Sequence, residues 1–213
     1  MVSDSHEHVA SEGYTFASNV YSNVIQMLAV FLVVLMGNLF LRWYVSIPLA
    51  MFFVGLSFKS KYRLISVAAS FGCITAVGMG PQLLSYICSA AIYTIIVLTS
   101  IVVGYIRGDR TMMRKLAYTA AAVISLTLMT YTILYFVSFF RIRMMFNRYY
   151  LLTLVGELAF FIIVLDEIES KSYMTVDEAS LELFYSVVKV FMQILRLILA
   201  NQSQKQKEKD KDE

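Results

Sequence analysis

Residues 180–200 read SLELFYSVVKVFMQILRLILA, and the charged tail NQSQKQKEKDKDE follows at 201–213. The first stretch is apolar enough and long enough to enter a membrane as a helix. Five polar residues nonetheless recur in it at steps of four and three: Glu182, Ser186, Lys189, Gln193 and Arg196. On an α-helix those steps place them on one narrow stripe. A charged stripe on a membrane-length helix is costly unless it faces protein or water, so we expect the rest of the chain to supply such a face.

The composition is typical of a membrane protein. Of the 213 residues, 59% are hydrophobic and 15% are charged, whereas soluble globular chains have about 45–50% apolar and about 25% charged residues. The basic residues stand in short clusters between apolar runs, as they do at membrane edges, so we do not expect nucleic-acid binding. Cys73 and Cys88 both lie inside apolar runs, which favours buried free thiols over a structural disulfide.

The apolar runs predict an all-α polytopic membrane protein with about seven helices. We expect a polar N-terminal lead at residues 1–19, a transmembrane helix bundle at 20–200 and the charged C-terminal tail at 201–213. The lead contains His-Glu-His around Glu7, but three adjacent residues on a terminus are a poor ligand set, and we interpret them as solvated. The predicted helices are 20–41, 43–58, 64–87, 90–106, 116–140, 149–165 and 180–200.

The boundary between the third and fourth helices is the hardest to place. Residues 64–106 carry no charge, and a single helix of that length would measure about 65 Å at about 1.5 Å per residue. That is about twice the hydrocarbon thickness, so two spans are expected. Two break points are available: the kink motif of Gly78, Gly80 and Pro81, and residues 88–91. We expect the motif to kink the third helix and residues 88–91 to separate the third helix from the fourth.

The distribution of Lys and Arg predicts the orientation. Counted on alternate sides of the predicted spans, the basic residues balance if the last helix crosses the membrane fully. They strongly favour the side of the N-terminus if that helix enters the membrane and turns back. The second arrangement obeys the positive-inside rule, with both termini in the cytosol. We therefore expect a cytosolic C-terminal tail.

Three stretches together resemble the Bax-inhibitor family of transmembrane proteins. Ala76–Leu83 reads AVGMGPQL and is similar to the G-P-x-L segment of the family's third helix. Phe160–Asp166 is an apolar run that ends in aspartate, as the family's sixth helix does. Leu181–Arg196, with the lysine-rich end after it, resembles the last helix of the animal endoplasmic-reticulum members most closely. The order and spacing of the apolar runs fit over residues 20–213.

The resemblance implies six helices around a central seventh, which either crosses the membrane or enters it and turns back. It also implies a multi-pass protein of the endoplasmic-reticulum membrane that suppresses programmed cell death and modulates calcium leak from the store. Family members are thought to sense pH through two aspartates, on the sixth and seventh helices. Asp166 matches the first, but the second falls at Ser186. Ala76 in place of the first glycine and a shortened link between helices three and four are further departures.

Two acidic residues are candidates for an ion pathway or a proton sensor together with Ser186. Asp166, at the end of the sixth span, could bind calcium transiently or hold a proton; alternatively it is an end-of-helix carboxylate in water. Glu182 lies one turn before Ser186 on the same face and could replace the missing aspartate. Two neighbouring carboxylates share protons because their like charges repel. The alternative is that Glu182 is an interfacial acid near the helix start, favoured there by the helix dipole.

Three further charges fall inside predicted spans: Glu157, Lys189 and Arg196. A lysine in the middle of a membrane costs about 2.5–3.5 kcal/mol on insertion scales. We predict that Glu157 and Lys189 face the interior of the bundle and pair there. They could instead lie on different faces with separate partners. A fixed cation near the path would weaken calcium conductance.

No enzymatic activity is expected, because no protease, zinc or phosphate-binding pattern occurs and both histidines lie in the polar lead. No cofactor or resident metal is expected, and calcium enters only as a transported ion. The tail is either a solvated end or a contact for anionic lipid or an acidic partner. The expected partners are membrane lipids and apoptosis-related membrane proteins. A non-conducting adaptor for apoptosis or stress-signalling membrane proteins stays open as a second function.

Overall fold

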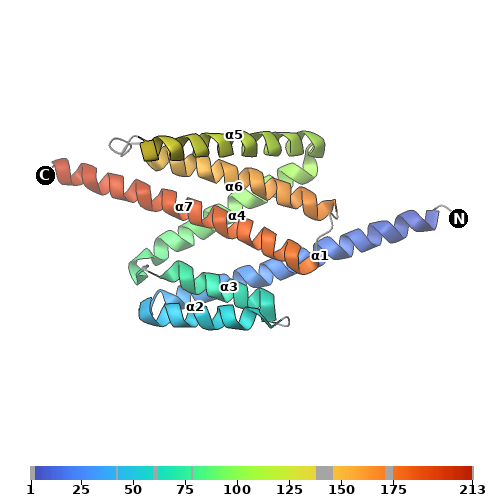
Figure 1. Cartoon of the computed structure of the whole chain (residues 1–213), viewed down its shortest axis with the longest axis horizontal. Helices are drawn as coiled ribbons and strands as arrows, with labels where there is room; N and C mark the ends of the chain where they lie inside the picture. Colours follow the sequence, from blue (N-terminus) through green and yellow to red (C-terminus); the bar gives the residue numbers. More distant parts are fainter. Residues whose placement is uncertain are drawn as a thin grey trace. The chain divides into compact units, whose positions relative to one another are not determined.

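The chain is all-helical in the part that its computed structural model describes, which confirms the predicted fold class (Figure 1). The described residues are 3–41, 43–59, 62–77, 79–137, 146–170 and 175–212. They form seven α-helices and one short 3-10 turn: α1 (Ser3–Asn38), α2 (Trp43–Ser57), α3 (Arg63–Ala76), η2 (Pro81–Leu83), α4 (Leu84–Arg107), α5 (Arg110–Val137), α6 (Phe146–Glu169) and α7 (Val176–Asp212).

The helices make this a membrane-embedded protein. Among the described residues, three segments are long and apolar enough to cross a membrane: Thr15–Asn38, Pro81–Arg107 and Val176–Gln202. Two further apolar helices, α2 and α3, are shorter. Helices suit this setting because each one satisfies its own backbone hydrogen bonds without water. The full number of crossings and the central position of α7 stay predictions.

The polar ends of the chain are helical, so the first and last helices are longer than the predicted 20–41 and 180–200 and extend into residues 1–19 and 201–213. Helix α1 begins at Ser3, and α7 continues to Asp212. The tail contains neither Gly nor Pro. Its Gln, Lys and Glu residues are good helix formers, so nothing in the local sequence ends the helix where the apolar run ends.

The break between α3 and α4 differs from the prediction of helices at 64–87 and 90–106. Helix α3 ends at Ala76, and α4 runs without interruption through residues 88–91. Pro81 is the first residue of η2, where a missing backbone N–H costs nothing, and Gly80 precedes it in an extended conformation. Gly78 of the predicted kink motif lies outside the described residues. The chain therefore breaks at the Gly80-Pro81 element, and residues 88–91, which contain neither Gly nor Pro, do not interrupt a helix.

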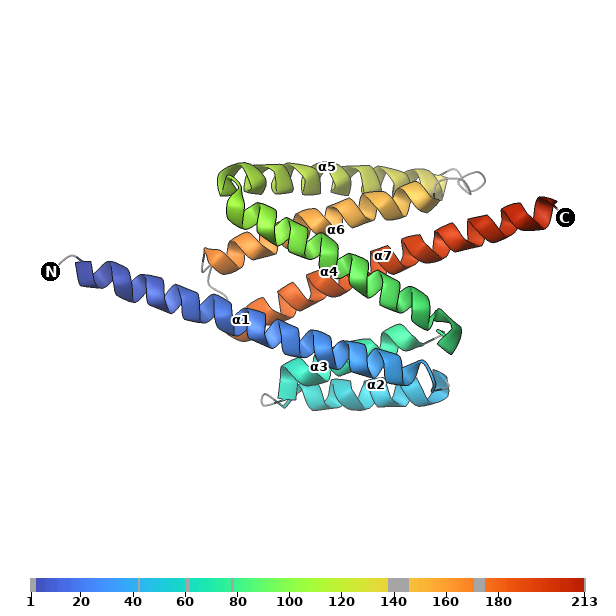
Figure 2. The ribbon, with the colours of Figure 1, turned by 180° about the vertical axis from the view of Figure 1, so that it is seen from behind.

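The helices belong to two compact units, each described here by itself. Unit 1 comprises Met1–Ser85 and Glu167–Phe184, and unit 2 comprises Tyr86–Asp166 and Tyr185–Glu213. In unit 1, α3 packs against both α1 and α2 (Figure 2). Gly72 permits the close approach of α1 and α3, because a Cβ at this position would lie 2.9 Å from the backbone oxygen of Phe31.

Aromatic side chains complete the core of unit 1. The fully buried Phe184, from the first part of α7, meets the ring of Phe31 edge-on with the centroids 6.1 Å apart. It meets the ring of Phe71 in the same way at 6.3 Å. Edge-to-face rings at these distances attract each other beyond the area they bury. This contact fixes the first part of α7 against α1 and α3 within unit 1.

In unit 2 the close approach is between α5 and α6. A Cβ at Gly156 would lie 3.0 Å from a side-chain carbon of Ile124, which is buried. The buried apolar residues that α6 and α7 contribute to unit 2 include Ala159, Phe161, Val164, Leu165, Val190, Ile194 and Leu195. The candidate site residues Glu157 and Asp166 lie on α6, and Lys189 lies on α7.

Candidate functional site

The junction between α4 and α5 is the element that shapes the first site. Helix α4 ends where the N–H of Gly108 donates to the backbone oxygen of Gly104 at 2.9 Å. Asp109 then caps α5, since its Oδ1 accepts the backbone N–H of Thr111 at 2.9 Å and of Met112 at 3.3 Å. Aspartate is among the best residues for this position because it satisfies donors that the first turn leaves unpaired. The capped junction reverses the chain and brings the end of α4 beside the start of α5.

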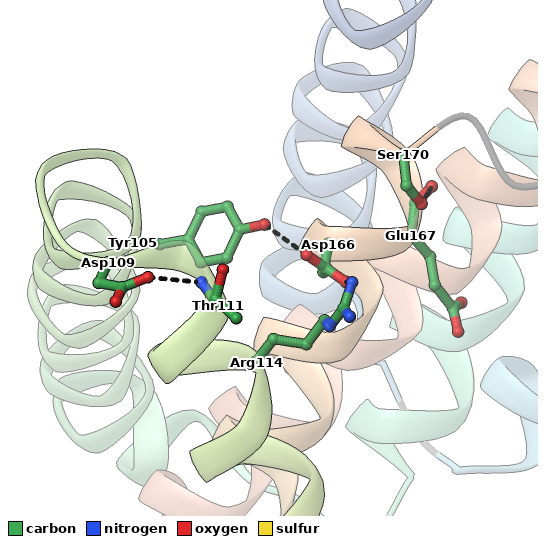
Figure 3. Close-up of polar contacts among 7 residues, drawn as sticks. All are labelled: Tyr105, Asp109, Thr111, Arg114, Asp166, Glu167 and Ser170. Carbon is green, nitrogen blue, oxygen red and sulfur yellow. Dashed lines mark hydrogen bonds and ion pairs between the residues drawn. The ribbon is translucent and has the colours of Figure 1, made fainter.

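Asp166 on α6 is held by both of those helix ends (Figure 3). The hydroxyl of Tyr105 donates to Asp166 Oδ1 at 2.9 Å. The guanidinium of Arg114 lies 3.6 Å from Asp166 Oδ2. Tyr105 is buried and carries the Arg110 guanidinium over its ring, 5.7 Å from the centroid. The Asp166 side chain is 17% exposed, so it is not the end-of-helix carboxylate in water that we gave as the alternative.

The contact between Arg114 and the Asp166 carboxylate is weak. The distance from Arg114 to Asp166 exceeds the 2.7–2.9 Å of a short charge-assisted hydrogen bond. Arg114 is 53% exposed, and exposed ion pairs contribute little to stability. A cation can therefore compete with Arg114 for the carboxylate at low cost. In the described part of the chain no three His, Cys, Asp or Glu side chains gather to hold a metal ion.

Glu157 on α6 and Lys189 on α7 form a second site in unit 2. The Lys189 ammonium lies 3.8 Å from Glu157 Oε2 and 5.3 Å from the centroid of the Phe160 ring. The predicted pairing of the two charges is thus confirmed. The predicted interior position is wrong for Lys189, whose side chain is 54% exposed, while that of Glu157 is 21% exposed. The ion pair therefore lies at the edge of the packed helices.

The polar stripe of α7 divides between a buried and an exposed side. At about 100° per residue, its five members span about 80° of the helix circumference. Ser186 and Gln193 are 0% and 8% exposed, and Glu182 is half-buried. Lys189 and Arg196, at the other margin, are exposed. The stripe follows the line along which α7 passes from the packed core to its surroundings.

Two buried oxygens of the stripe lack hydrogen-bond partners in the described part of the chain. They are Ser186 Oγ and Gln193 Oε1. Ser186 is therefore a buried hydroxyl. Asp166 belongs to unit 2 and Glu182 to unit 1, and their sharing of a proton stays a prediction.

The two residues that contact Asp166 are not predicted by the sequence. Tyr105 and Arg114 lie 61 and 52 residues from Asp166, and no local pattern connects them with it.

The start of α7 is marked by a local sequence signal. Thr175 Oγ1 accepts the N–H of Glu178 at 3.3 Å, and Glu178 Oε2 accepts the N–H of Thr175 at 3.2 Å. This is a capping box, and the Thr-x-x-Glu spacing marks a helix that begins at Val176 rather than at residue 180.

These features define a membrane-embedded helical protein with two polar sites. At one, the Asp166 carboxylate near the end of α6 contacts Tyr105 and Arg114. At the other, Glu157 of α6 forms an ion pair with Lys189 of α7. Comparisons of the chain with models of known protein families, with curated proteins and with solved structures found no match.

Proposed function

We propose that this chain is a Bax-inhibitor-like, multi-pass protein of the endoplasmic-reticulum membrane that suppresses programmed cell death and modulates calcium leak from the store. The sequence resemblance supports the class of protein. The proposed calcium leak is supported by the contacts of Asp166. Its carboxylate accepts a hydrogen bond from the Tyr105 hydroxyl at 2.9 Å and lies 3.6 Å from the Arg114 guanidinium. The C-terminal tail lies in the cytosol in this proposal.

The three side chains supply a physical mechanism for control. Calcium prefers oxygen ligands, and the Asp166 carboxylate and the Tyr105 hydroxyl supply oxygens that Arg114 shields. While Arg114 neutralises the carboxylate, a calcium ion gains little by approaching it. When Arg114 no longer contacts Asp166, the carboxylate keeps its negative charge and attracts calcium ions that move through the helix bundle, which raises the leak. Because Ser186 supplies no second carboxylate, the response to pH is weaker than in a protein with two aspartates.

The test is calcium flux from proteoliposomes across a range of pH. Arg114→Gln is expected to raise the flux severalfold, and adding Asp166→Asn to it is expected to return the flux to the wild-type value. Lys115→Gln is the matched control, because it removes a neighbouring exposed cation that makes no described contact with Asp166. If Arg114→Gln behaves like Lys115→Gln, the proposed control of leak by this site is wrong. Glu182→Gln tests the second acid, and an altered pH response is the expected result.

A non-conducting adaptor for apoptosis or stress-signalling membrane proteins is the second candidate. Two observations favour it: both Asp166 and Glu157 already have a cationic neighbour, and Ser186 is a buried hydroxyl. The cationic neighbours offset the charges of Asp166 and Glu157, and Ser186 adds no charge, so less negative charge is left to attract calcium. Flux at background in the wild type and in all the variants above would select the adaptor and exclude the leak.

A further inference from the structure

Lys189 occupies an unfavourable place in the membrane. It is the middle residue of the candidate span Val176–Gln202, with thirteen residues on either side. Each half of that span is about 20 Å long at about 1.5 Å per residue, and half of the hydrocarbon layer is about 15 Å thick. Lysines near helix ends extend their ammonium groups to the interface. From the middle of the span the side chain is too short to do so.

The contacts of Lys189 within unit 2 leave its charge only partly compensated. An ammonium group has three donors, and Glu157 Oε2 at 3.8 Å is beyond hydrogen-bond distance. The Phe160 ring, 5.3 Å away, adds a cation–π attraction. The Lys189 side chain is 54% exposed. Placing that exposed part against lipid would cost about 2.5–3.5 kcal/mol on insertion scales, so lipid is an unfavourable neighbour.

We propose that the face of α7 around Lys189 binds a partner transmembrane helix that carries an acidic residue near its middle. The partner helix is inferred from charge complementarity. A carboxylate at the same depth in the membrane as Lys189 would supply the hydrogen-bond acceptors that Glu157, at 3.8 Å, does not. Arg196, seven residues further along the same exposed margin, adds a second cation on the side toward the tail. A second copy of this chain in the same orientation would bring Lys189 to the same depth, and the two like charges would repel.

The interaction does not depend on calcium leak, since it requires only that α7 crosses the membrane with Lys189 near the middle of the span. It goes beyond the adaptor function by stating the chemistry of the partner. A failure of the flux experiments leaves it intact, and a failure of the binding experiment below leaves the leak intact.

The experiment measures binding in phosphatidylcholine vesicles by energy transfer between the labelled full-length protein and labelled synthetic helices. The helices are leucine–alanine spans that differ only at the middle position, which is Glu, Gln or Leu. We expect the Glu helix to bind at least about tenfold more tightly than the Leu helix, with the Gln helix between them. Equal binding of the Glu and Leu helices to the wild-type protein overturns the proposal.

Variants of the protein locate the interaction. Lys189→Gln should remove the preference for the Glu helix, whereas Lys189→Arg, which keeps the charge, should retain it. Glu157→Gln should strengthen binding, because Lys189 then lacks its internal neighbour. Arg196→Gln is the control for a general effect of positive charge and should keep the preference for a central Glu. A preference that survives in Lys189→Gln overturns the proposal.

Two further measurements assign the surface to another occupant if the proposal is wrong. In Lys189→Cys, a charged thiol reagent that reacts well above the wild-type background would show that water lines this face. Energy transfer between two differently labelled copies of the protein that is lost in Lys189→Gln would show that a second copy covers it. Either result overturns the proposal, and no reaction together with no self-association supports it.

Discussion

Gly72→Ala is the substitution whose effect on the fold can be worked out most directly from the structure. Gly72 lies inside α3, where α3 packs against α1 in unit 1. A Cβ added there would lie 2.9 Å from the backbone oxygen of Phe31, 3.1 Å from the backbone nitrogen of Leu35 and 3.1 Å from Cβ of Val34. Two of these atoms belong to the α1 backbone and cannot rotate away. The two helices must therefore move apart.

Two opposing terms decide the magnitude. Alanine is favoured over glycine inside a helix by about 1 kcal/mol. Overpacking a tight contact costs about 1–3 kcal/mol, and the backbone atoms at Gly72 place this case near the upper value. The expected net loss is about 2 kcal/mol of unfolding free energy. For a chain of this length that corresponds to a fall in melting temperature of about 4–8 °C.

Gly104→Ala is the matched control. Gly104 lies in α4, and a Cβ added there meets nothing within 4 Å. Only the propensity term remains, so the melting temperature should rise by up to about 4 °C. Unfolding can be followed in detergent by a thiol-reactive dye, because Cys73 is buried beside Gly72, with Cys88→Ala present in every sample. The reasoning is refuted if Gly72→Ala is as stable as Gly104→Ala.

Two further predictions use the same melting assay. Thr175→Ala should lower the unfolding free energy by about 1 kcal/mol, because it removes the oxygen that accepts the Glu178 N–H at the start of α7; Thr175→Ser should not, and equal losses in both would show that the cap is not the cause. Ser186→Ala should leave the protein at least as stable as the wild type, because the buried Oγ has no described partner. Ser186→Asp should destabilise it by more than about 2 kcal/mol, because it buries a charge; destabilisation by the alanine variant would show that the hydroxyl is bonded.

The helix boundaries follow residues that alter the backbone more closely than they follow the length of the apolar runs. Pro81 and the Thr175-x-x-Glu178 box are local signals with a backbone mechanism, and the structure uses both. The predicted break near residues 88–91 came from hydrophobic length alone. Length says how many helices a run must contain, but only a residue that alters the backbone says where one ends. The helical tail to Asp212 follows the same reasoning.

The sequence by itself determined that the chain is helical and membrane-embedded, because long charge-free runs can satisfy their backbone groups in lipid only as helices. It also determined that five polar residues of α7 share one stripe, because their spacing matches the helix period. Only the tertiary structure decided that Ser186 and Gln193 are buried while Lys189 and Arg196 are exposed. It alone joined Asp166 to Tyr105 and Arg114. The reason is that the rotation of each helix about its axis, and so the partner of each side chain, is set by packing against helices distant in the sequence.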